Sequence, residues 1–340
     1  MSTTEAWRIE GAFGVENLRR GTQEAEPLGP NDVRVRVHAV SLNYRDWLMV
    51  QGLYNPKQPL PLVPCSDGAG EIVEVGAAVT RVKVGDRVVG LFAQGWLAGR
   101  ARRDKIRRTL GGPLPGALRQ EMVLDEEGVS KLPAGYDLVH ASTLPCAALT
   151  AWSALEQAGL QPGETVLLQG TGGVSLFAAQ LAKMQGARIV VTSKSDEKLA
   201  RAQRELGVEA GINYQTTPQW SAKVRELTGG EGADVILEVG GGATLPESVR
   251  AIRAGGCIAL IGVLSGVRSE LMLTPVLMQN VRIQGVLVGH RDSFEAMLRA
   301  IEHARLVPVI DRVFGFDEVP QAFAHLASGQ HFGKVVIRVA

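Results

Sequence analysis

Cysteine is scarce in this sequence of 340 residues, which contains only Cys65, Cys146 and Cys257. Three widely spaced cysteines provide neither a disulfide framework nor a C-x-x-C pair, so a small secreted scaffold and a zinc ribbon are both excluded. Such cysteine usage is typical of a reducing compartment. We therefore expect a cytoplasmic protein.

Long apolar runs and an excess of one charge are also missing. No stretch of about 18 apolar residues occurs, which argues against a transmembrane helix, and the first residues lack the basic and apolar regions of a signal peptide. The 36 Lys and Arg residues balance 35 Asp and Glu residues, leaving a net charge of +1. A chain with so small a net charge has no overall electrostatic attraction for anionic surfaces, so we expect it to bind neither nucleic acid nor a membrane.

Hydrophobic residues make up 45% of the sequence, enough for a core in each of two domains at this length. Residues 33–40 alternate apolar and charged side chains, which is the pattern of a strand with one solvated face, and residues 70–76 and 84–90 repeat it. The N-terminal third of the chain is therefore predicted to be mainly β-structure.

From Thr165 onward, apolar strands alternate with amphipathic helices. Strands are predicted at 166–168, 188–192, 233–238, 256–262, 282–288 and 334–339, and helices at 177–185, 196–206 and 293–303. This alternation indicates βαβ crossovers and a parallel sheet. The predicted fold class is α/β, with a doubly wound parallel sheet following a mainly β domain.

A glycine-rich turn, Gly170-x-Gly172-x-x-Ser175, lies between the strand 166–168 and the helix 177–185. The first glycine permits the tight turn, the second lets a pyrophosphate approach the backbone, and Ser175 is small enough for a helix to pack on a strand. The helix N-terminus would face the pyrophosphate. We therefore predict a dinucleotide-binding loop.

The end of the next strand indicates which dinucleotide binds. Where a carboxylate would accept from the ribose 2′-hydroxyl, the sequence has Ser193 and Lys194, with no acid before Asp196. A lysine without a carboxylate suits a 2′-phosphate. The sequence therefore predicts NADP, as NADPH, as the cofactor.

Three sequence blocks resemble those of medium-chain dehydrogenases/reductases, which belong to the alcohol dehydrogenase superfamily. They are residues 41–46, residues 64–70 with 84–88, and residues 144–152, in the family's order before the glycine loop. The resemblance spans essentially the whole chain. It implies a GroES-like catalytic domain made of residues 1–147 and 288–340, a Rossmann domain of residues 148–287, and a homodimer.

In zinc enzymes of this family, Cys, His and Cys bind the catalytic zinc. The matching positions here are Asn43, Ser66 and Cys146. Asn43 and Ser66 are neutral oxygen donors, which hold Zn²⁺ poorly, and residues 92–116, which match the structural-zinc lobe, contain no cysteine. We therefore expect no zinc, and Cys146 is expected to act as a small buried hydrophobic residue.

Residues 43–46, Asn-Tyr-Arg-Asp, resemble the corresponding block of zinc-free enoyl reductase domains and quinone oxidoreductases. The resemblance implies hydride transfer from NADPH to an enone or a quinone, whose developing enolate needs only hydrogen-bond donors. The expected catalytic residues are Asn43, Tyr44 and Tyr54 as donors, with Asp46 orienting them.

The resemblance also implies a set of cofactor contacts. Tyr214 matches a tyrosine that lies against the 2′-phosphate in quinone reductases, and Lys334 matches a cation that faces the pyrophosphate. The expected cofactor-binding residues are Thr150, Gly170, Gly172, Gly173, Val174, Ser193, Lys194, Lys198, Tyr214, Val239, Ile261, Val263, Val286, Val288 and Lys334. A solvated surface position is the alternative for Lys194 and Lys334.

Two other functions stay open at this point. A carbonyl reductase of the alcohol or aldehyde dehydrogenase type would work without metal or with a rebuilt site. A nucleotide-bound binding protein with an idle site would contact RNA or an acidic partner through residues 100–108, which contain six basic residues and one acid. That stretch has no interleaved aromatic residues, so a solvated loop is its simpler interpretation.

Overall fold

The computed structural model describes residues 3–340, whose contacts divide the chain into two compact units. The β-rich unit comprises the chain up to Leu149 together with Gly289–Ala340, and the parallel-sheet unit comprises Thr150–Val288. Within residues 3–340, no helix is both long enough and apolar enough to cross a membrane.

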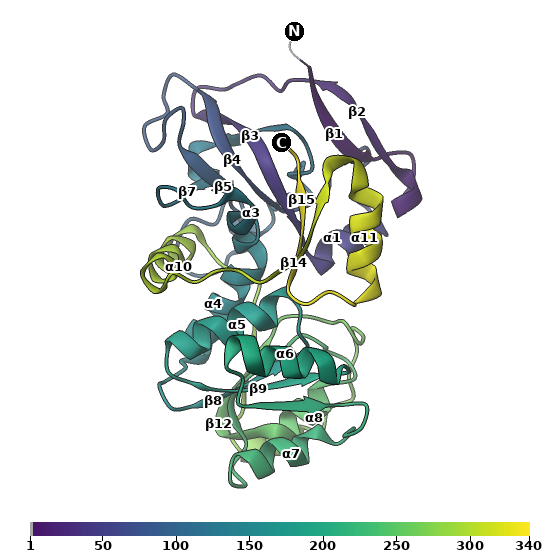
Figure 1. Ribbon diagram of the computed structural model, residues 1–340, viewed down its shortest axis with the longest axis vertical. Coiled ribbons are helices and arrows are strands. Elements are labelled where there is room, and N and C mark those ends of the chain that lie inside the picture. Colours follow the sequence, from purple (N-terminus) through teal and green to yellow (C-terminus); the bar gives the residue numbers. More distant parts are fainter. Residues whose placement is uncertain (1–2) are drawn as a thin grey trace. The chain divides into compact units, whose positions relative to one another are not determined.

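A seven-stranded sheet forms the centre of the β-rich unit, in the order β14-β15-β3-β4-β5-β7, with β6 also paired to β3 (Figure 1). Along β3, Val33, Val35 and Val37 are fully buried, whereas Arg36 between them is exposed, as the alternation predicted. The strands are β1 (Thr3–Ile9), β2 (Leu18–Glu24), β3 (Asp32–Leu42), β4 (Asp67–Val75), β5 (Arg87–Gly90), β6 (Glu121–Asp125), β7 (Val129–Lys131), β14 (Ile310–Gly315) and β15 (Lys334–Arg338).

The C-terminal strand β15 determines what the interior of this unit contains. It pairs antiparallel with β3, with Val335 opposite Leu42, so that Lys334 reaches the end of β3. The helical elements of the unit are α1 (Tyr44–Val50), α2 (Arg103–Ile106), α3 (Leu138–Ala141), the π-helical turn η3 (Leu144–Ala148), α10 (Arg291–Ala304) and α11 (Val319–Ser328), with short 3₁₀ turns at 15–17, 126–128 and 316–318.

The second unit is a parallel sheet of six strands in the order β10-β9-β8-β11-β12-β13. This order is that of a doubly wound Rossmann sheet and confirms the predicted fold class. Helices α5 and α6 cover one face, and α7 and α8 cover the other (Figure 1). The elements are α4 (Leu149–Ala158), β8 (Thr165–Gln169), α5 (Gly173–Met184), β9 (Arg188–Ser193), α6 (Asp196–Leu206), β10 (Ala210–Asn213), α7 (Trp220–Leu227), β11 (Ala233–Glu238), α8 (Leu245–Ala251), β12 (Ile252–Leu260), α9 (Leu273–Met278) and β13 (Arg282–Gly285).

Several predicted boundaries differ from the structure: the strand predicted at 256–262 spans Ile252–Leu260, and the strand predicted at 282–288 ends at Gly285. Two further boundaries differ for clear local reasons. Helix α5 begins at Gly173 instead of Phe177, because the last residues of the glycine turn already have helical geometry. Strand β5 begins at Arg87 instead of Val84, because Gly85 has a φ of +88° in a turn that a hydrogen bond from Lys83 N to the Asp86 carboxylate closes at 3.0 Å.

The basic stretch 100–108 forms the short helix α2 and the coil around it. Its five arginines are exposed, and Arg102 pairs with Asp104 inside the stretch at 3.2 Å. Lys105 donates to the backbone oxygen of Ala98 at 2.8 Å. The stretch is therefore a solvated segment whose side-chain hydrogen bonds are made within itself and with the nearby residue Ala98.

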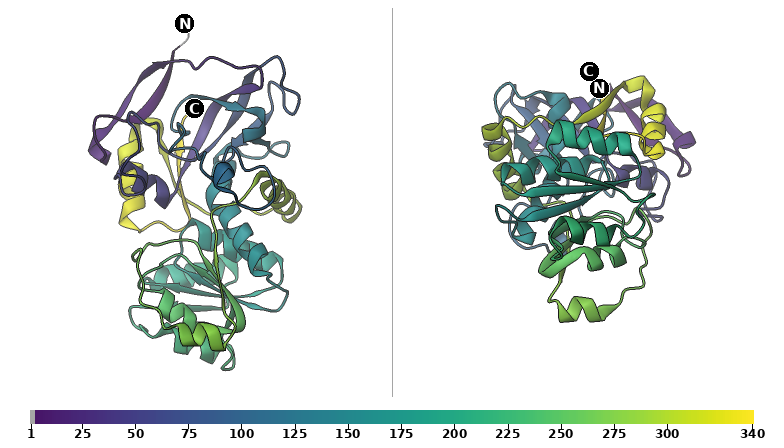
Figure 2. Two further views of the ribbon diagram at one scale, coloured as in Figure 1. Left: turned by 180° about the vertical axis from the view of Figure 1, so that it is seen from behind. Right: turned by 60° about the horizontal axis from the view of Figure 1, so that its bottom comes forward.

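Strand β13 is an edge of the parallel sheet, and its four residues are all exposed. Large apolar side chains on and before α9 are exposed too: Val267 is 80% exposed, Met272 and Met278 74%, Leu273 71% and Leu277 75%. Figure 2 shows this segment (light green) at the periphery of its unit. An unpaired edge beside apolar side chains is a surface that another chain can cover.

We expect a second copy of this chain to cover that surface, giving a homodimer. Because lysine is poorly tolerated in an apolar interface, the double substitution Leu273→Lys with Leu277→Lys should convert the dimer to a monomer at micromolar concentration, as measured by light scattering after size exclusion. Val307→Lys, at an exposed apolar residue elsewhere, is the control. A monomeric wild type, or a doubly substituted chain that stays dimeric, would contradict this expectation.

Candidate functional site

Helix α1 begins where β3 ends, and its first turn is closed by Asn43 and Asp46. The backbone nitrogen of Asn43 donates to Asp46 Oδ2 at 2.8 Å, which caps the helix N-terminus. Asp46 is fully buried, and its Oδ1 accepts from the backbone nitrogen of Ser66 at 3.2 Å. Burial raises the pKa of Asp46 although Arg45 lies beside it. Asp46 thus links α1 to the start of β4, as an orienting residue would.

Arg45, to which the sequence analysis assigned no role, is the best-bonded side chain of this region. Its guanidinium lies 3.2 Å from Asp46 and donates to the backbone oxygens of residues 110–112 at 2.9, 3.1 and 3.2 Å. The rings of Tyr54 and Phe92 lie 4.9 and 5.4 Å from it. Its only sequence signal was its place next to Asp46 in the block 43–46.

Asp67 is the second buried carboxylate of the region. It accepts from Ser66 Oγ at 2.7 Å and from the backbone nitrogen of Cys146 at 3.2 Å. Cys65, with a φ of +71°, makes the turn that brings Ser66 and Asp67 inward. Burial raises the pKa of Asp67 to about 6, while the positive charge of Lys334 opposes the rise.

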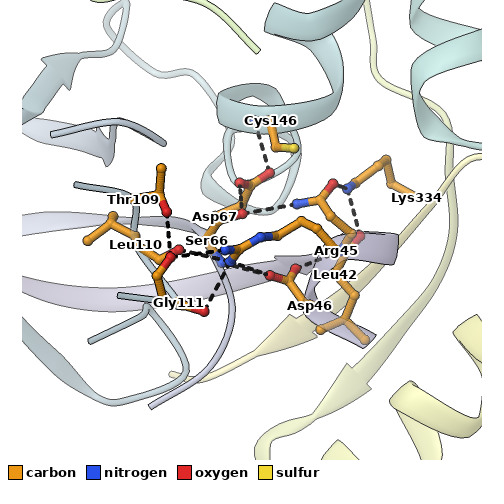
Figure 3. Close-up of polar contacts among 12 residues, drawn as sticks. Leu42, Arg45, Asp46, Ser66, Asp67, Thr109, Leu110, Gly111, Cys146 and Lys334 are labelled. Carbon is orange, nitrogen blue, oxygen red and sulfur yellow. Dashed lines mark hydrogen bonds and ion pairs between the residues drawn. The ribbon is translucent and has the colours of Figure 1, made fainter. Parts of the chain in front are cut away.

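Lys334 joins this network instead of facing solvent, so the alternative of a solvated position is wrong for this residue. It is 3% exposed, and its Nζ donates to the backbone oxygen of Leu42 at 2.7 Å and to Asn43 Oδ1 at 2.5 Å (Figure 3). Asn43 Nδ2 lies 3.4 Å from Ser66 Oγ. Burial lowers the pKa of Lys334, whereas Asp67 opposes that effect. The pairing of β15 with β3 is the reason for this placement.

The two candidate tyrosines lie at the accessible side of this network. Tyr44 begins α1 and is 42% exposed, and Tyr54 follows α1 and is 45% exposed. Cys146 lies in the π-helical turn and is partly buried, and burial raises the pKa of its thiol. The structure therefore brings together Asn43, Asp46, Ser66, Cys146 and Lys334, and leaves both tyrosine side chains open to ligands.

The glycine turn after β8 is shaped for a ligand. Gly170 has a φ of +74°, and a Cβ at Gly170 or Gly172 would meet no atom within 4 Å, so open space lies over the backbone there. Ser175 is buried, and its Oγ donates to the backbone oxygen of Gln169 at 2.7 Å. Gly173 and Val174 begin α5, whose amides face that space. These features fit a dinucleotide pyrophosphate.

The predicted 2′-phosphate residues are brought together at the ends of β9 and β10. The backbone nitrogen of Tyr214 donates to Ser193 O at 3.1 Å, and Ser193 Oγ accepts from Ser195 N at 3.2 Å. Lys194 is exposed, as is Tyr214 at 40%. Lys198 N donates to Ser195 Oγ at 3.3 Å, which caps α6. No carboxylate ends β9.

The other expected cofactor residues of this unit lie near the carboxyl edge of the same sheet, except for Thr150, which is buried in α4. Val239 follows β11, Ile261 and Val263 follow β12, and Val286 and Val288 follow β13. Ligands of open parallel sheets bind at this edge.

The sequence analysis did not identify Glu238, whose carboxylate fixes the loop after β11 by hydrogen bonds. Glu238 is fully buried, and its carboxylate accepts from Gln169 Nε2 at 2.7 Å and from the backbone nitrogens of Gly240 and Gly241 at 2.9 and 2.8 Å. An acid at the end of an otherwise apolar strand was the available signal. Glu238 thereby fixes the loop that carries Val239 beside the glycine turn.

Within residues 3–340, no three or more His, Cys, Asp or Glu side chains are grouped so that they could hold a metal ion. The buried network therefore combines amide, hydroxyl, carboxylate, ammonium and guanidinium groups.

Comparison with protein families gives two matches. Residues 29–134 match the alcohol dehydrogenase GroES-like domain, and residues 173–303 match the family described as zinc-binding dehydrogenase. A zinc-type alcohol dehydrogenase-like protein of Schizosaccharomyces pombe is 39% identical over 334 residues, covering 96% of each chain. A quinone oxidoreductase-like protein 2 homolog of Nematostella vectensis is 34% identical, covering 97% of this chain and 85% of the relative.

Solved structures agree with these relatives. A Sinorhizobium meliloti 1021 protein described as an alcohol dehydrogenase superposes with a TM-score of 0.93 at 43% identity over the full length of both chains. The quinone oxidoreductase from Coxiella burnetii superposes with a TM-score of 0.83 at 25% identity, again over both full chains. The mainly β domain is thus GroES-like, as the resemblance implied.

The raised pKa of Asp67 predicts a pH dependence of stability. The pKa of Asp67 is about 6 in the folded protein and usually 3.8. Asp67 therefore stabilises the folded state at pH values below 3.8, and this stabilisation is lost as the pH rises through about 6. The shift corresponds to up to about 3 kcal/mol. As the pH rises between these two pKa values, the free energy of unfolding in urea should fall for wild type relative to Asp67→Asn. Asp317→Asn, at a side chain that is 87% exposed, is the control, and parallel curves for wild type and Asp67→Asn would contradict the expectation.

Proposed function

Since this chain belongs to the medium-chain dehydrogenase/reductase superfamily and is an NAD(P)-dependent oxidoreductase, we propose that it uses NADPH to reduce an activated carbonyl compound, an enone or a quinone, without zinc. The observation that carries the proposal is the buried network around Asn43. Lys334 contributes an ammonium to that network, and the Asn43 amide nitrogen donates to Ser66 Oγ and interacts with the carboxylate of Asp67.

The reaction requires a group that stabilises an oxyanion. When bound, NADPH supplies a hydride and leaves as NADP⁺. As hydride adds to the β-carbon of an enone, an electron pair moves onto the carbonyl oxygen, and the resulting enolate takes a proton at the α-carbon from water or a side chain. A donor at the carbonyl oxygen lowers the barrier because it stabilises the charge that develops there. For a quinone, the same hydride and proton yield the hydroquinone.

Asn43 is the donor that we assign to this oxygen. Its Oδ1 is engaged by Lys334, so its Nδ2 is the end that can donate to a ligand. Tyr44 and Tyr54 are exposed and can supply a second donor or the proton. Asp46 holds the first turn of α1 and so orients Asn43.

The residues at the family's catalytic zinc positions do not fit zinc. Asn43 and Ser66 bring an amide and a hydroxyl, and both are already engaged by Lys334 and Asp67. Burial favours the neutral thiol of Cys146, whereas Zn²⁺ needs a thiolate. An ammonium 2.5 Å from Asn43 Oδ1 would also repel a divalent cation.

The names of the relatives suggest the alternative. The Schizosaccharomyces pombe relative is called a zinc-type alcohol dehydrogenase-like protein, and alcohol oxidation would need an acceptor for the hydroxyl proton. Zinc supplies this in metal enzymes by stabilising the alkoxide. In this chain, Asn43 and Ser66 offer no comparable acceptor, which favours carbonyl reduction.

A screen of NADPH oxidation across enones, quinones, aldehydes and simple alcohols tests this function. We expect an enone or a quinone to be reduced with a kcat/KM orders of magnitude above that for NADP⁺-linked oxidation of a simple alcohol. Asn43→Ala should lower kcat by about 100-fold, as loss of one oxyanion donor does. Lys83→Met, at an exposed lysine, should leave the rates unchanged.

Two results of that screen would contradict the proposal. Faster oxidation of an ethanol-type alcohol would assign the chain to alcohol dehydrogenation. Elemental analysis is the second measurement: we expect well below one zinc per chain and activity that survives a chelator, and stoichiometric zinc would refute a zinc-free site.

The cofactor preference rests on Ser193, Lys194 and Tyr214. A serine in place of a carboxylate removes the repulsion of a 2′-phosphate. Lys194 is exposed at the end of β9, and the ring of Tyr214 follows β10, which is paired to β9. These neighbours support NADPH as the preferred dinucleotide.

Titration of both dinucleotides at fixed salt tests this preference. A charge-assisted hydrogen bond contributes about 1.5–3 kcal/mol, or about ten- to a hundredfold in affinity. NADPH should therefore bind at least about tenfold more tightly than NADH. Lys194→Ala should weaken NADPH binding and leave NADH binding nearly unchanged, whereas Lys223→Ala, at another exposed lysine ion-paired to Glu226, should change neither. Equal affinities in wild type, or equal losses in Lys194→Ala, would refute this assignment.

A further inference from the structure

Two cations are buried in the β-rich unit, and they are held differently. Arg45 lies 3.2 Å from the carboxylate of Asp46 and donates to backbone oxygens as well. Lys334 forms no ion pair with any carboxylate of residues 3–340, and its two hydrogen bonds go to the neutral oxygens of Leu42 and Asn43. Its charge is therefore compensated at a distance, by Asp67 first and by Asp46 less strongly.

The hydrogen bonds between Lys334 and Asp67 all run in one direction (Figure 3). Lys334 Nζ donates to Asn43 Oδ1 at 2.5 Å, Asn43 Nδ2 donates to Ser66 Oγ at 3.4 Å, and Ser66 Oγ donates to Asp67 Oδ1 at 2.7 Å. An ammonium can only donate, so the amide oxygen of Asn43 must face Lys334. The amide nitrogen is thereby turned away from Lys334, toward Ser66 Oγ and the carboxylate of Asp67.

We propose that Lys334 is a positioning residue that acts through Asn43: it fixes the orientation of the amide and supplies the positive charge that strengthens Asn43 Nδ2 as the donor to the substrate carbonyl oxygen. This inference rests on the proposed carbonyl reduction. A donor whose own acceptor end is bound to a cation is polarised toward donation. In zinc members of the superfamily, a metal bound by the residue that matches Asn43 supplies positive charge there, and Lys334 supplies it in this chain.

Two other roles for Lys334 make different predictions. A cation facing the cofactor pyrophosphate, as the family resemblance implied, would act on NADPH affinity. A lysine that merely fills space in the core would act on folding alone. The hydrogen bonds of the Lys334 side chain both lie in the β-rich unit, at Leu42 and Asn43, so we expect its effect to appear in the rate of the reduction.

A double-mutant cycle on Asn43→Ala and Lys334→Met tests the proposal. Lys334→Met should lower kcat for the enone or quinone at least tenfold, with KM and the NADPH dissociation constant changed less than threefold. In the Asn43→Ala background, the same substitution should lower kcat less than threefold further, because Asn43 is the group through which Lys334 acts. Lys83→Met, at an exposed lysine, should leave all three quantities unchanged.

A second variant separates charge from hydrogen bonding and guards against misfolding. Lys334→Gln keeps an N–H donor but removes the charge, so it should show the same loss of kcat as Lys334→Met. Circular dichroism and the urea midpoint identify a variant that has not folded. A Lys334→Gln enzyme with wild-type kcat would overturn the assignment of the charge.

The outcomes against the proposal are distinct from failure of the proposed function. A tenfold weaker NADPH affinity in Lys334→Met would assign Lys334 to the cofactor, and multiplicative losses of kcat in the double variant would show that it acts independently of Asn43. If wild type reduces no enone or quinone, the proposed function has failed. The interaction between Lys334 and Asn43 can then be tested from the urea midpoints of unfolding. If Lys334→Met shifts the midpoint equally in wild type and in Asn43→Ala, the two residues do not interact and the proposal is overturned.

Discussion

Burial of opposite charges is the constraint on which the interior of the β-rich unit depends. Arg45, Asp46, Asp67 and Lys334 each leave water almost completely, and removing one partner of such a set typically costs about 3–5 kcal/mol because the other charge stays buried. These side chains come from α1, the start of β4 and the last strand β15. The first and last parts of the chain must therefore be in place together before the site exists.

The parallel-sheet unit meets the opposite requirement, because a dinucleotide site has to stay open. Gly170 and Gly172 leave space over the backbone, and Glu238 keeps the neighbouring loop rigid without reaching into that space. The carboxylate of Glu238 is satisfied entirely by donors of its own unit, so it does not repel the phosphates of a ligand as a free carboxylate would. The β-rich unit thus buries a cluster of charged side chains, whereas the parallel-sheet unit leaves backbone exposed at its glycine turn.

The same fold carries different chemistry when a few side chains change, because function resides in the site and not in the architecture. At the superfamily's zinc positions, this chain has Asn43 and Ser66, which are held by Lys334 and Asp67. In the proposed reduction, the ammonium of Lys334 with its neutral ligands takes the place of a metal with anionic ligands as the source of positive charge for the substrate oxygen. The two kinds of site suit different substrates. An alcohol needs its proton removed, whereas a conjugated carbonyl needs only a hydrogen-bond donor at its oxygen.

The sequence by itself determined the features that depend on neighbours along the chain. The alternation in residues 33–40 predicted β3, the turn at Gly170 predicted the dinucleotide loop, and the block 43–46 identified Asn43 and Asp46, because each signal lies within one strand, turn or helix start. Only the tertiary structure decided the place of Lys334, which the sequence left as a solvated or cofactor-facing lysine. Lys334 meets Asn43 across 291 residues. That contact follows from strand pairing and burial, which are properties of the whole unit and leave no local trace in the sequence.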